Sequence, residues 1–157
     1  MSNLLSTTLV LLAIAFSPLY SQSNPVLNTA TTLVKQHEGL VLKPYQDSTG
    51  ISIGYGTNLS AGITQEEAEY LLTYRLAKLQ SRLQKLLWYV QLTPVRKVAI
   101  LDLAYNVGYS GLLNFTDLIW CLKHHYWNGA ANRMKQSLWY KQTGTRAIYL
   151  VQLMRHG

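Results

Sequence analysis

The acidic side chains are few, and most of them have structural explanations. Among 157 residues the sequence has seven carboxylates, which are Glu38, Asp47, Glu66, Glu67, Glu69, Asp102 and Asp117. Four of these fall in the first turns of predicted helices, where a negative charge stabilises the helix dipole. Asp102 lies inside a strongly apolar run, where a carboxylate is expected to serve as a structural hydrogen-bond acceptor. Glu38 and Asp47 are therefore the two candidates for chemistry.

These two carboxylates are predicted to have different surroundings. Glu38 stands at the C-terminal end of a predicted helix, where the negative end of the helix dipole disfavours the ionised form. Asp47 stands beside Ser48 and Thr49 in a predicted turn, which favours a solvated and ionised carboxylate. Cleavage of a glycosidic bond uses such a pair, because one group protonates the leaving oxygen while the other activates water or stabilises positive charge. Because a Glu and an Asp at this spacing are common, the pair alone is only a hypothesis.

A predicted helix and a predicted small sheet position the two carboxylates. Asn24 followed by Pro25 is typical of a helix start, and Gly39 is typical of a helix end. Short β-prone runs between residues 41 and 58 are interrupted by Gly50, Gly54 and Gly56. Such glycines predict tight hairpins. Glu38 would then end the helix, and Asp47 would enter the first hairpin.

The rest of the chain is predicted to be helical. Thr64 and Glu67 have the spacing of a capping box, and leucines then recur at alternating intervals of four and three residues as far as Leu86. A helix that begins at Thr93-Pro94 is apolar on nearly all sides, which predicts a buried, central element. Shorter helices are predicted near residues 117–122, 128–136 and 146–154. The predicted fold class is α+β, with a mainly helical lobe and a small β-hairpin lobe joined by the long helix.

Composition excludes several classes of protein. Hydrophobic residues make up 48% and charged residues 13% of the chain, which excludes an intrinsically disordered protein. Cys121 is the single cysteine, so neither an internal disulfide nor a cysteine-based zinc knuckle can form. The four histidines lack the spacing of a metalloprotease motif, and we expect no metal and no cofactor. His124 and His125 are expected to lie on a solvated helix face.

The net charge of +7 predicts an anionic partner. Bacterial cell-wall polymers and nucleic acids both meet this expectation. The basic residues are spread along predicted amphipathic helices, without a Lys/Arg run or a known nucleic-acid motif. We therefore expect no nucleic-acid partner.

Residues 1–23 have the pattern of a targeting segment. No charged residue precedes Lys35, and residues 9–16 are continuously apolar. Such an apolar core, followed by polar residues, is typical of a secretory signal peptide and short for a membrane-spanning helix. Because no Lys or Arg comes early, a releasable N-terminal anchor with transient membrane association, or a buried first helix, are alternatives. We expect an exported protein, periplasmic or extracellular, whose main domain covers residues 24–157.

Several motifs follow one another from residue 38 to the last residue. The first comprises residues 38–50 (EGLVLKPYQDSTG) and 53–58 (IGYGTN). The others are residues 62–69 (GITQEEAE), 92–96 (LTPVR), 104–108 (AYNVG), 137–147 (SLWYKQTGTRA) and 154–157 (MRHG). Together they resemble the phage-type (T4-like) lysozymes and endolysins, the glycoside hydrolase family 24 muramidases. The resemblance implies a lysozyme-like catalytic domain over residues 24–157.

The resemblance assigns roles to three residues of the first motif. Glu38 matches the family's proton-donating glutamate, and Asp47 matches the aspartate that positions the attacking water or stabilises the transition state. Ser52 stands where the family usually has a threonine, and it keeps the hydroxyl group but lacks the methyl group. Thr49 and Thr57 are alternatives for this third position.

Four residues of the later motifs also match family positions. Arg146 matches an arginine that faces the catalytic glutamate, where a cation would favour the ionised carboxylate and oppose the helix dipole. Tyr105, Asn106 and Trp139 match positions in the substrate cleft or at the lobe interface. For Trp139, plain core packing is an equal alternative. The resemblance thus adds one supporting residue and three substrate-binding residues.

The resemblance implies a monomeric, bacteriolytic hydrolase. Its expected reaction is hydrolysis of the β-1,4 bond between N-acetylmuramic acid and N-acetylglucosamine in peptidoglycan glycan strands, with inversion at the anomeric carbon. A lytic transglycosylase is one alternative, but it keeps the glutamate and needs no aspartate, so Asp47 favours hydrolysis. A catalytically inactive relative that only binds peptidoglycan is the other alternative, and Ser52 is the reason to consider it.

Overall fold

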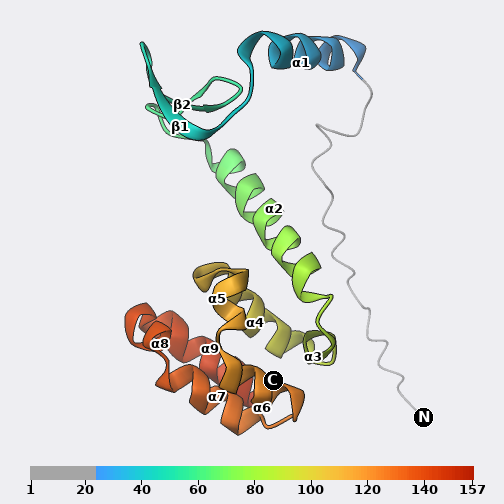
Figure 1. The fold of residues 1–157 in the computed structure, drawn as a ribbon, viewed down its shortest axis with the longest axis vertical. Coiled ribbons are helices and arrows are strands. Elements are labelled where there is room, and N and C mark those ends of the chain that lie inside the picture. The colour runs from blue at the N-terminus through green and yellow to red at the C-terminus, as the bar shows by residue number, and fades with distance from the viewer. Residues whose placement is uncertain (1–23) are drawn as a thin grey trace, which may run out of the picture. The chain divides into compact units, whose positions relative to one another are not determined.

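The computed structural model describes residues 24–157. The predicted signal peptide or anchor, residues 1–23, lies outside the described residues, so the domain boundary after residue 23 stays a prediction. The chain divides into two compact units, of which the first ends at Ile63 and the second begins at Thr64. Within the described residues, the first unit holds one helix and a small sheet, and the second unit is helical (Figure 1).

The first unit begins with helix α1, Pro25–Glu38. The side chain of Asn24 accepts two hydrogen bonds of 3.1 Å from backbone N–H groups of the first turn, as expected of an N-cap. Gly39, with a φ of 68°, ends the helix in a conformation that favours glycine. The predicted start and end are confirmed, and Glu38 is the last residue of the helix.

A three-stranded antiparallel sheet follows, in the order β1-β2-β3. Its strands are β1 (Val41–Asp47), β2 (Gly50–Gly54) and β3 (Thr57–Asn58). Asp47 pairs with Gly50 across a tight turn. On the central strand, Ser52 pairs with Tyr45 of β1 and Asn58 of β3. The predicted hairpins are confirmed, and Asp47 is the last residue of its strand.

The second unit opens with the long helix α2, Gln65–Leu83. Its predicted capping box is present: the Glu67 N–H donates to the Thr64 hydroxyl at 3.2 Å, and the Thr64 N–H donates to the Glu67 carboxylate at 2.8 Å. The helix ends earlier than the leucine spacing predicts. The Leu86 N–H donates to the Leu83 carbonyl at 2.9 Å. A hydrogen bond between residues three positions apart is typical of a 3₁₀ turn, so the α-helix does not continue to Leu86.

The central element of the second unit is α4, Pro94–Val107. Thr93 is its N-cap, and the side chains of Ile100 and Leu103 are fully buried, which confirms the predicted central helix. The other helices of this unit are α3 (Leu87–Val90), α5 (Tyr109–Leu113), α6 (Thr116–Lys123), α7 (Trp127–Gln136), α8 (Leu138–Thr143) and α9 (Thr145–His156). The three predicted shorter helices correspond to α6, α7 and α9, whereas α3, α5 and α8 were not predicted.

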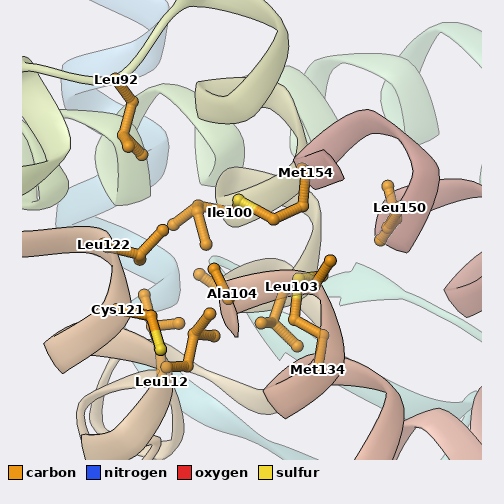
Figure 2. Close-up of a cluster of buried hydrophobic side chains, with 14 of the residues drawn as sticks. Leu92, Ile100, Leu103, Ala104, Leu112, Cys121, Leu122, Met134, Leu150 and Met154 are labelled. Carbon is orange, nitrogen blue, oxygen red and sulfur yellow. The ribbon is translucent and has the colours of Figure 1, made fainter. Parts of the chain in front are cut away.

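Side chains from α4, α6, α7 and α9 meet in the hydrophobic core of the second unit (Figure 2). Leu103 of α4 lies in this cluster together with Met134 of α7 and Met154 of α9. The Arg96 side-chain N–H (Nε) donates to the Met154 carbonyl at 3.0 Å, which joins the start of α4 to the end of α9. Burial of this apolar surface is the main stabilisation of the unit.

The described chain is mainly helical with one small antiparallel sheet, which confirms the predicted α+β class. Within residues 24–157, no helix combines the length and the apolar character that crossing a membrane requires.

Candidate active site

Glu38 lies against the turn between β2 and β3. A Cβ atom placed on Gly56 would be 3.2 Å from Oε2 of Glu38, so the carboxyl group lies directly over this glycine. Gly56 has a φ of 81°, which other residues rarely adopt. One turn earlier on α1, Nζ of Lys35 is 5.7 Å from the ring centre of Tyr55. The last turn of α1 therefore contacts the β2–β3 turn, and this contact holds Glu38 beside the sheet.

Asp47 is held by the turn that follows it. Its Oδ1 atom accepts hydrogen bonds from the Thr49 N–H at 2.7 Å, the Thr49 hydroxyl at 2.6 Å and the Gly50 N–H at 3.1 Å. An aspartate that accepts bonds from residues two and three positions later forms an Asx turn, for which Asp is favoured. The local sequence therefore orients this carboxylate.

These donors and the Ser52 side chain keep Asp47 ionised. A hydrogen bond from the Ser52 side chain makes the largest contribution, followed by those from Thr49, and together they lower the pKa of Asp47 from 3.8 to about 2. Donors have this effect because they stabilise the charged form of the carboxyl group. The result agrees with the ionised state that the sequence predicts.

Ser52 lies on the central strand β2, with 1% of its surface exposed. A buried hydroxyl group is costly unless it has a hydrogen-bond partner, and the bond to Asp47 supplies one. The structure thus brings Ser52 and Asp47 together on neighbouring strands of one hairpin. Thr57, an alternative for the third position, lies on β3 and is not among the residues that lower the pKa of Asp47.

A network of hydrogen-bonded polar side chains next to Asp47 could not be predicted from the sequence. Nδ2 of Asn58 donates to the carbonyl and to the hydroxyl oxygen of Thr49, each at 3.1 Å. The Ser60 N–H donates to Oδ1 of Asn58 at 2.7 Å, and the Ile51 N–H donates to the Ser60 hydroxyl at 3.0 Å. The two-residue spacing of Asp47 and Thr49 predicts the bond between these two residues, where this network begins. The bonds from Asn58 to Thr49 have no such signal, because they join residues nine positions apart.

Arg146 and Asp102 form an ion pair within the second unit. Nε and Nη2 of Arg146 each lie 2.7 Å from Oδ1 of Asp102. Both side chains are partly exposed, so the pair contributes little to stability. Asp102 is a structural acceptor, as the sequence predicts. The expectation that Arg146 faces Glu38 stays a prediction, because the two residues lie in different units.

The three predicted substrate-binding residues also lie in the second unit. Tyr105 and Asn106 are exposed near the C-terminal end of α4. Trp139 of α8 is 5% exposed and packs in the hydrophobic core, which is one of its two predicted roles. Among the described residues, its indole N–H has no hydrogen-bond partner. The contacts of these residues with substrate stay predictions.

The candidate catalytic residues of the first unit supply carboxyl and hydroxyl groups. Within residues 24–157, no three His, Cys, Asp or Glu side chains are grouped as metal ligands would be. Glu38 is exposed and Asp47 is partly exposed, so a large substrate can reach both. Exposed carboxyl groups can take part in acid–base catalysis.

Comparison with known proteins decides the family. The family model for phage lysozyme matches residues 35–155, which is more than half of the chain. The chain belongs to the phage lysozyme family. It is therefore a glycoside hydrolase, and peptidoglycan is its substrate class. The matched range includes Glu38, Asp47, Ser52 and Arg146, and it confirms the resemblance by which they were selected.

Three curated relatives show how much of a phage lysozyme the chain covers. The endolysin of Acyrthosiphon pisum secondary endosymbiont phage 1 is 36% identical over an alignment of 110 positions, which covers 67% of this chain and 75% of the endolysin. The "Probable T4-type lysozyme 1" of Dictyostelium discoideum is 24% identical over an alignment of 130 positions, which covers 80% of this chain and 76% of that protein. The pre-baseplate central spike protein Gp5 of Enterobacteria phage T4 is 26% identical over 175 residues. That alignment covers 90% of this chain but 30% of the spike protein.

Proposed function

We propose that the protein is an exported muramidase that hydrolyses the β-1,4 bond between N-acetylmuramic acid and N-acetylglucosamine. The observation that carries the proposal is the Asp47 carboxylate, which Ser52 and Thr49 keep ionised. Glu38 supplies a second carboxyl group in the same compact unit. Two carboxyl groups of this kind provide the acid and the base that hydrolysis of a glycosidic bond needs.

Glu38 is the general acid in this proposal, and it protonates the leaving glycosidic oxygen. Its carboxyl group extends from the end of α1 over Gly56. Because Gly56 has no side chain, the surface beside the carboxyl group stays free for a polymer to approach. This contact also limits the directions that the Glu38 side chain can adopt.

Asp47 is the group that orients and activates the attacking water. An ionised carboxylate accepts a hydrogen bond and then a proton from that water. Ser52 acts through Asp47, because its buried hydroxyl group is bonded to the carboxylate. Attack by water on the face opposite the leaving oxygen inverts the anomeric configuration.

The resemblance also assigns roles in substrate binding to residues of the second unit. The resemblance gives Arg146 a supporting role, and its pair with Asp102 holds the guanidinium group in place. Tyr105 and Asn106 offer an exposed ring and an exposed amide, which suit the sugar ring and the N-acetyl group of a glycan strand. Trp139, which packs in the core, is the third residue that the resemblance assigns to substrate binding. We expect the protein to act as a monomer.

The direct test is hydrolysis of purified peptidoglycan by variants with one carboxylate changed. Glu38→Gln removes the transferable proton, and Asp47→Asn removes the base. Each should lower the rate by about 100-fold or more, which is the usual contribution of such a group. Glu66→Gln is the matched control, because Glu66 is an exposed carboxylate in the first turn of α2 and outside the capping box. If folded Glu38→Gln hydrolyses the wall at a rate close to that of Glu66→Gln, the assignment is wrong.

The reaction products distinguish the proposed reaction from its alternatives. Hydrolysis leaves reducing sugar ends, whereas a lytic transglycosylase leaves anhydro ends. We expect reducing ends, with the inverted anomer appearing first in an NMR spectrum of the fresh product. Anhydro ends would identify a transglycosylase, and binding without any product would identify an inactive relative.

Export is the part of the proposal that depends on residues 1–23. The apolar segment at residues 9–16 supports it. N-terminal sequencing of the exported protein tests it: a start close to residue 24 indicates a cleaved signal peptide. A start at residue 1 in the membrane fraction indicates an anchor, and retention of all the protein inside the producing cell contradicts export.

A further inference from the structure

A groove lies between α6 and α7, and none of the proposed catalytic residues lines it. Its main hollow has a volume of about 490 Å³, and its lining includes Asp117, Trp120, Tyr126, Asn132, Arg133 and Gln136. This volume is in the usual range of small-molecule sites. A second hollow of about 380 Å³ shares three of these residues, Asp117, Arg133 and Gln136. We call the two hollows together the α6–α7 groove, and their continuity suits an extended ligand.

One wall of the α6–α7 groove is aromatic. Trp120 is 57% exposed and Tyr126 is 56% exposed, so a ligand can reach both rings. The ring of His124 stacks on Trp120 with 4.2 Å between ring centres, and its Nδ1–H donates to the Trp120 carbonyl at 2.7 Å. The stack orients the indole ring, while more than half of the residue stays open to solvent.

The link between α6 and α7 sets the position of Tyr126. His125 has a φ of 55°, which is uncommon for residues other than glycine, and the Tyr126 N–H donates to the Cys121 carbonyl at 2.9 Å. Gly129 leaves room for the ring, because a Cβ atom there would overlap Tyr126. The backbone therefore sets the position of Tyr126, and Gly129 leaves the space that its ring occupies.

The polar part of the groove carries no net charge. Nη1 of Arg133 lies 3.4 Å from Oδ2 of Asp117, and it donates to Oε1 of Gln136 at 3.4 Å. Both charged side chains are more than half exposed, so a ligand can reach their remaining donors and acceptors. Because the two charges compensate each other, this lining favours a neutral ligand with many hydroxyl groups over a polyanion.

We propose that the α6–α7 groove is a second saccharide-binding site, which holds a peptidoglycan glycan strand independently of Glu38 and Asp47. A pyranose ring has an apolar C–H face that can stack on Trp120, and its hydroxyl groups can bond to Asp117 and Arg133. The binding chemistry follows from the groove itself, and the choice of peptidoglycan as the polymer rests on the proposed function. A second site of this kind raises the effective concentration of enzyme at the wall.

The test uses the full chain carrying Glu38→Gln, so that binding is measured without hydrolysis. The tetramer of N-acetylglucosamine is titrated while the NMR signal of the Trp120 indole N–H is followed, and we expect this signal to shift. In the same background, Trp120→Ala should weaken co-sedimentation with purified peptidoglycan by roughly threefold to tenfold, as expected for one aromatic stacking contact. Tyr149→Ala is the matched control, because Tyr149 is 63% exposed on α9 and lies outside the groove lining.

Two results would overturn the proposal. One is a Trp120 signal that does not move at saturating tetramer, and the other is equal sedimentation of Trp120→Ala and Tyr149→Ala. Gly129→Ala is a second variant that displaces Tyr126 and keeps every aromatic ring, and it should also weaken binding. Because hydrolysis plays no part in these measurements, an inert groove leaves the assignment of Glu38 standing. Equally, an error in that assignment leaves the shift of the Trp120 signal unaffected.

Discussion

The Thr49 hydroxyl donates a 2.6 Å hydrogen bond to Oδ1 of Asp47 and accepts one of 3.1 Å from Nδ2 of Asn58. Through this hydroxyl, a residue of β3 supports a carboxylate at the end of β1. A carboxylate that orients water must keep both its charge and its direction, so groups that hold it belong to the site.

Thr49→Val removes the hydroxyl at nearly constant shape. The backbone N–H donors of residues 49 and 50 remain, but the pKa of Asp47 should rise from about 2 toward 3.8. We expect hydrolysis of peptidoglycan to slow several-fold, because the carboxylate is less well oriented. An NMR titration of the Asp47 carboxyl carbon and initial rates measure the two effects. Thr49→Ser keeps the hydroxyl and should keep both properties; a Thr49→Val protein with an unchanged pKa for Asp47 would contradict the prediction.

Ser52→Ala removes the donor that contributes most to the low pKa of Asp47. We expect a larger rise in that pKa than for Thr49→Val, together with slower hydrolysis. Ser52→Thr keeps the hydroxyl group and should keep the activity, provided that the buried position accepts one more methyl group. The same titration and rate measurements apply. Wild-type rates for Ser52→Ala would show that another group holds the carboxylate.

The low pKa of Asp47 predicts how stability responds to acid. The folded value, about 2, lies below the ordinary value of 3.8, so ionised Asp47 contributes fully to stability above about pH 4. This contribution is lost as the pH falls through about 2. The difference in free energy of unfolding between wild type and Asp47→Asn should therefore be constant from about pH 6 to 4 and shrink toward pH 2. Urea unfolding at these values measures it, and a change between about pH 6 and 8 would be inconsistent with the prediction.

Gly56→Ala is expected to move the Glu38 carboxyl group. The new Cβ atom would lie 3.2 Å from Oε2 of Glu38, which is closer than ordinary packing allows. Gly54→Ala is the matched control, because Gly54 also has a positive φ, 71° against 81°, but a Cβ atom there meets nothing within 4 Å. Both variants should lose stability in thermal unfolding, whereas only Gly56→Ala should lose activity per folded molecule. Equal activities would show that Glu38 adapts to the methyl group.

Helix starts and turns that depend on bonds between neighbouring residues could be predicted from the sequence. The start of α1 depends on Asn24, and the start of α2 depends on the pair Thr64 and Glu67. These caps are made by side chains that bond to backbone groups within three residues. The turn at Asp47 also depends on bonds between residues two and three positions apart, and its sequence alone indicates an ionised carboxylate.

Elements that depend on packing could not be predicted in this way. Helices α3, α5 and α8 have six residues or fewer, which is too short for an apolar period to be recognised. Such short helices are unstable by themselves, and each of these places a buried side chain in the core: Tyr89, Leu112 and Trp139. Packing in the core therefore stabilises these helices, and a short stretch of neighbouring residues does not indicate that they form.

The sequence by itself determined the two candidate carboxylates, the helix end and the turn that carry them, and the family to which the chain belongs. Only the tertiary structure decided that Asn58 supports Asp47 through Thr49, and that Arg146 pairs with Asp102. The physical reason is the distance along the chain. Caps and turns join residues two or three positions apart, whereas these contacts join residues 9 and 44 positions apart, which meet only when strands pair and helices pack around a core.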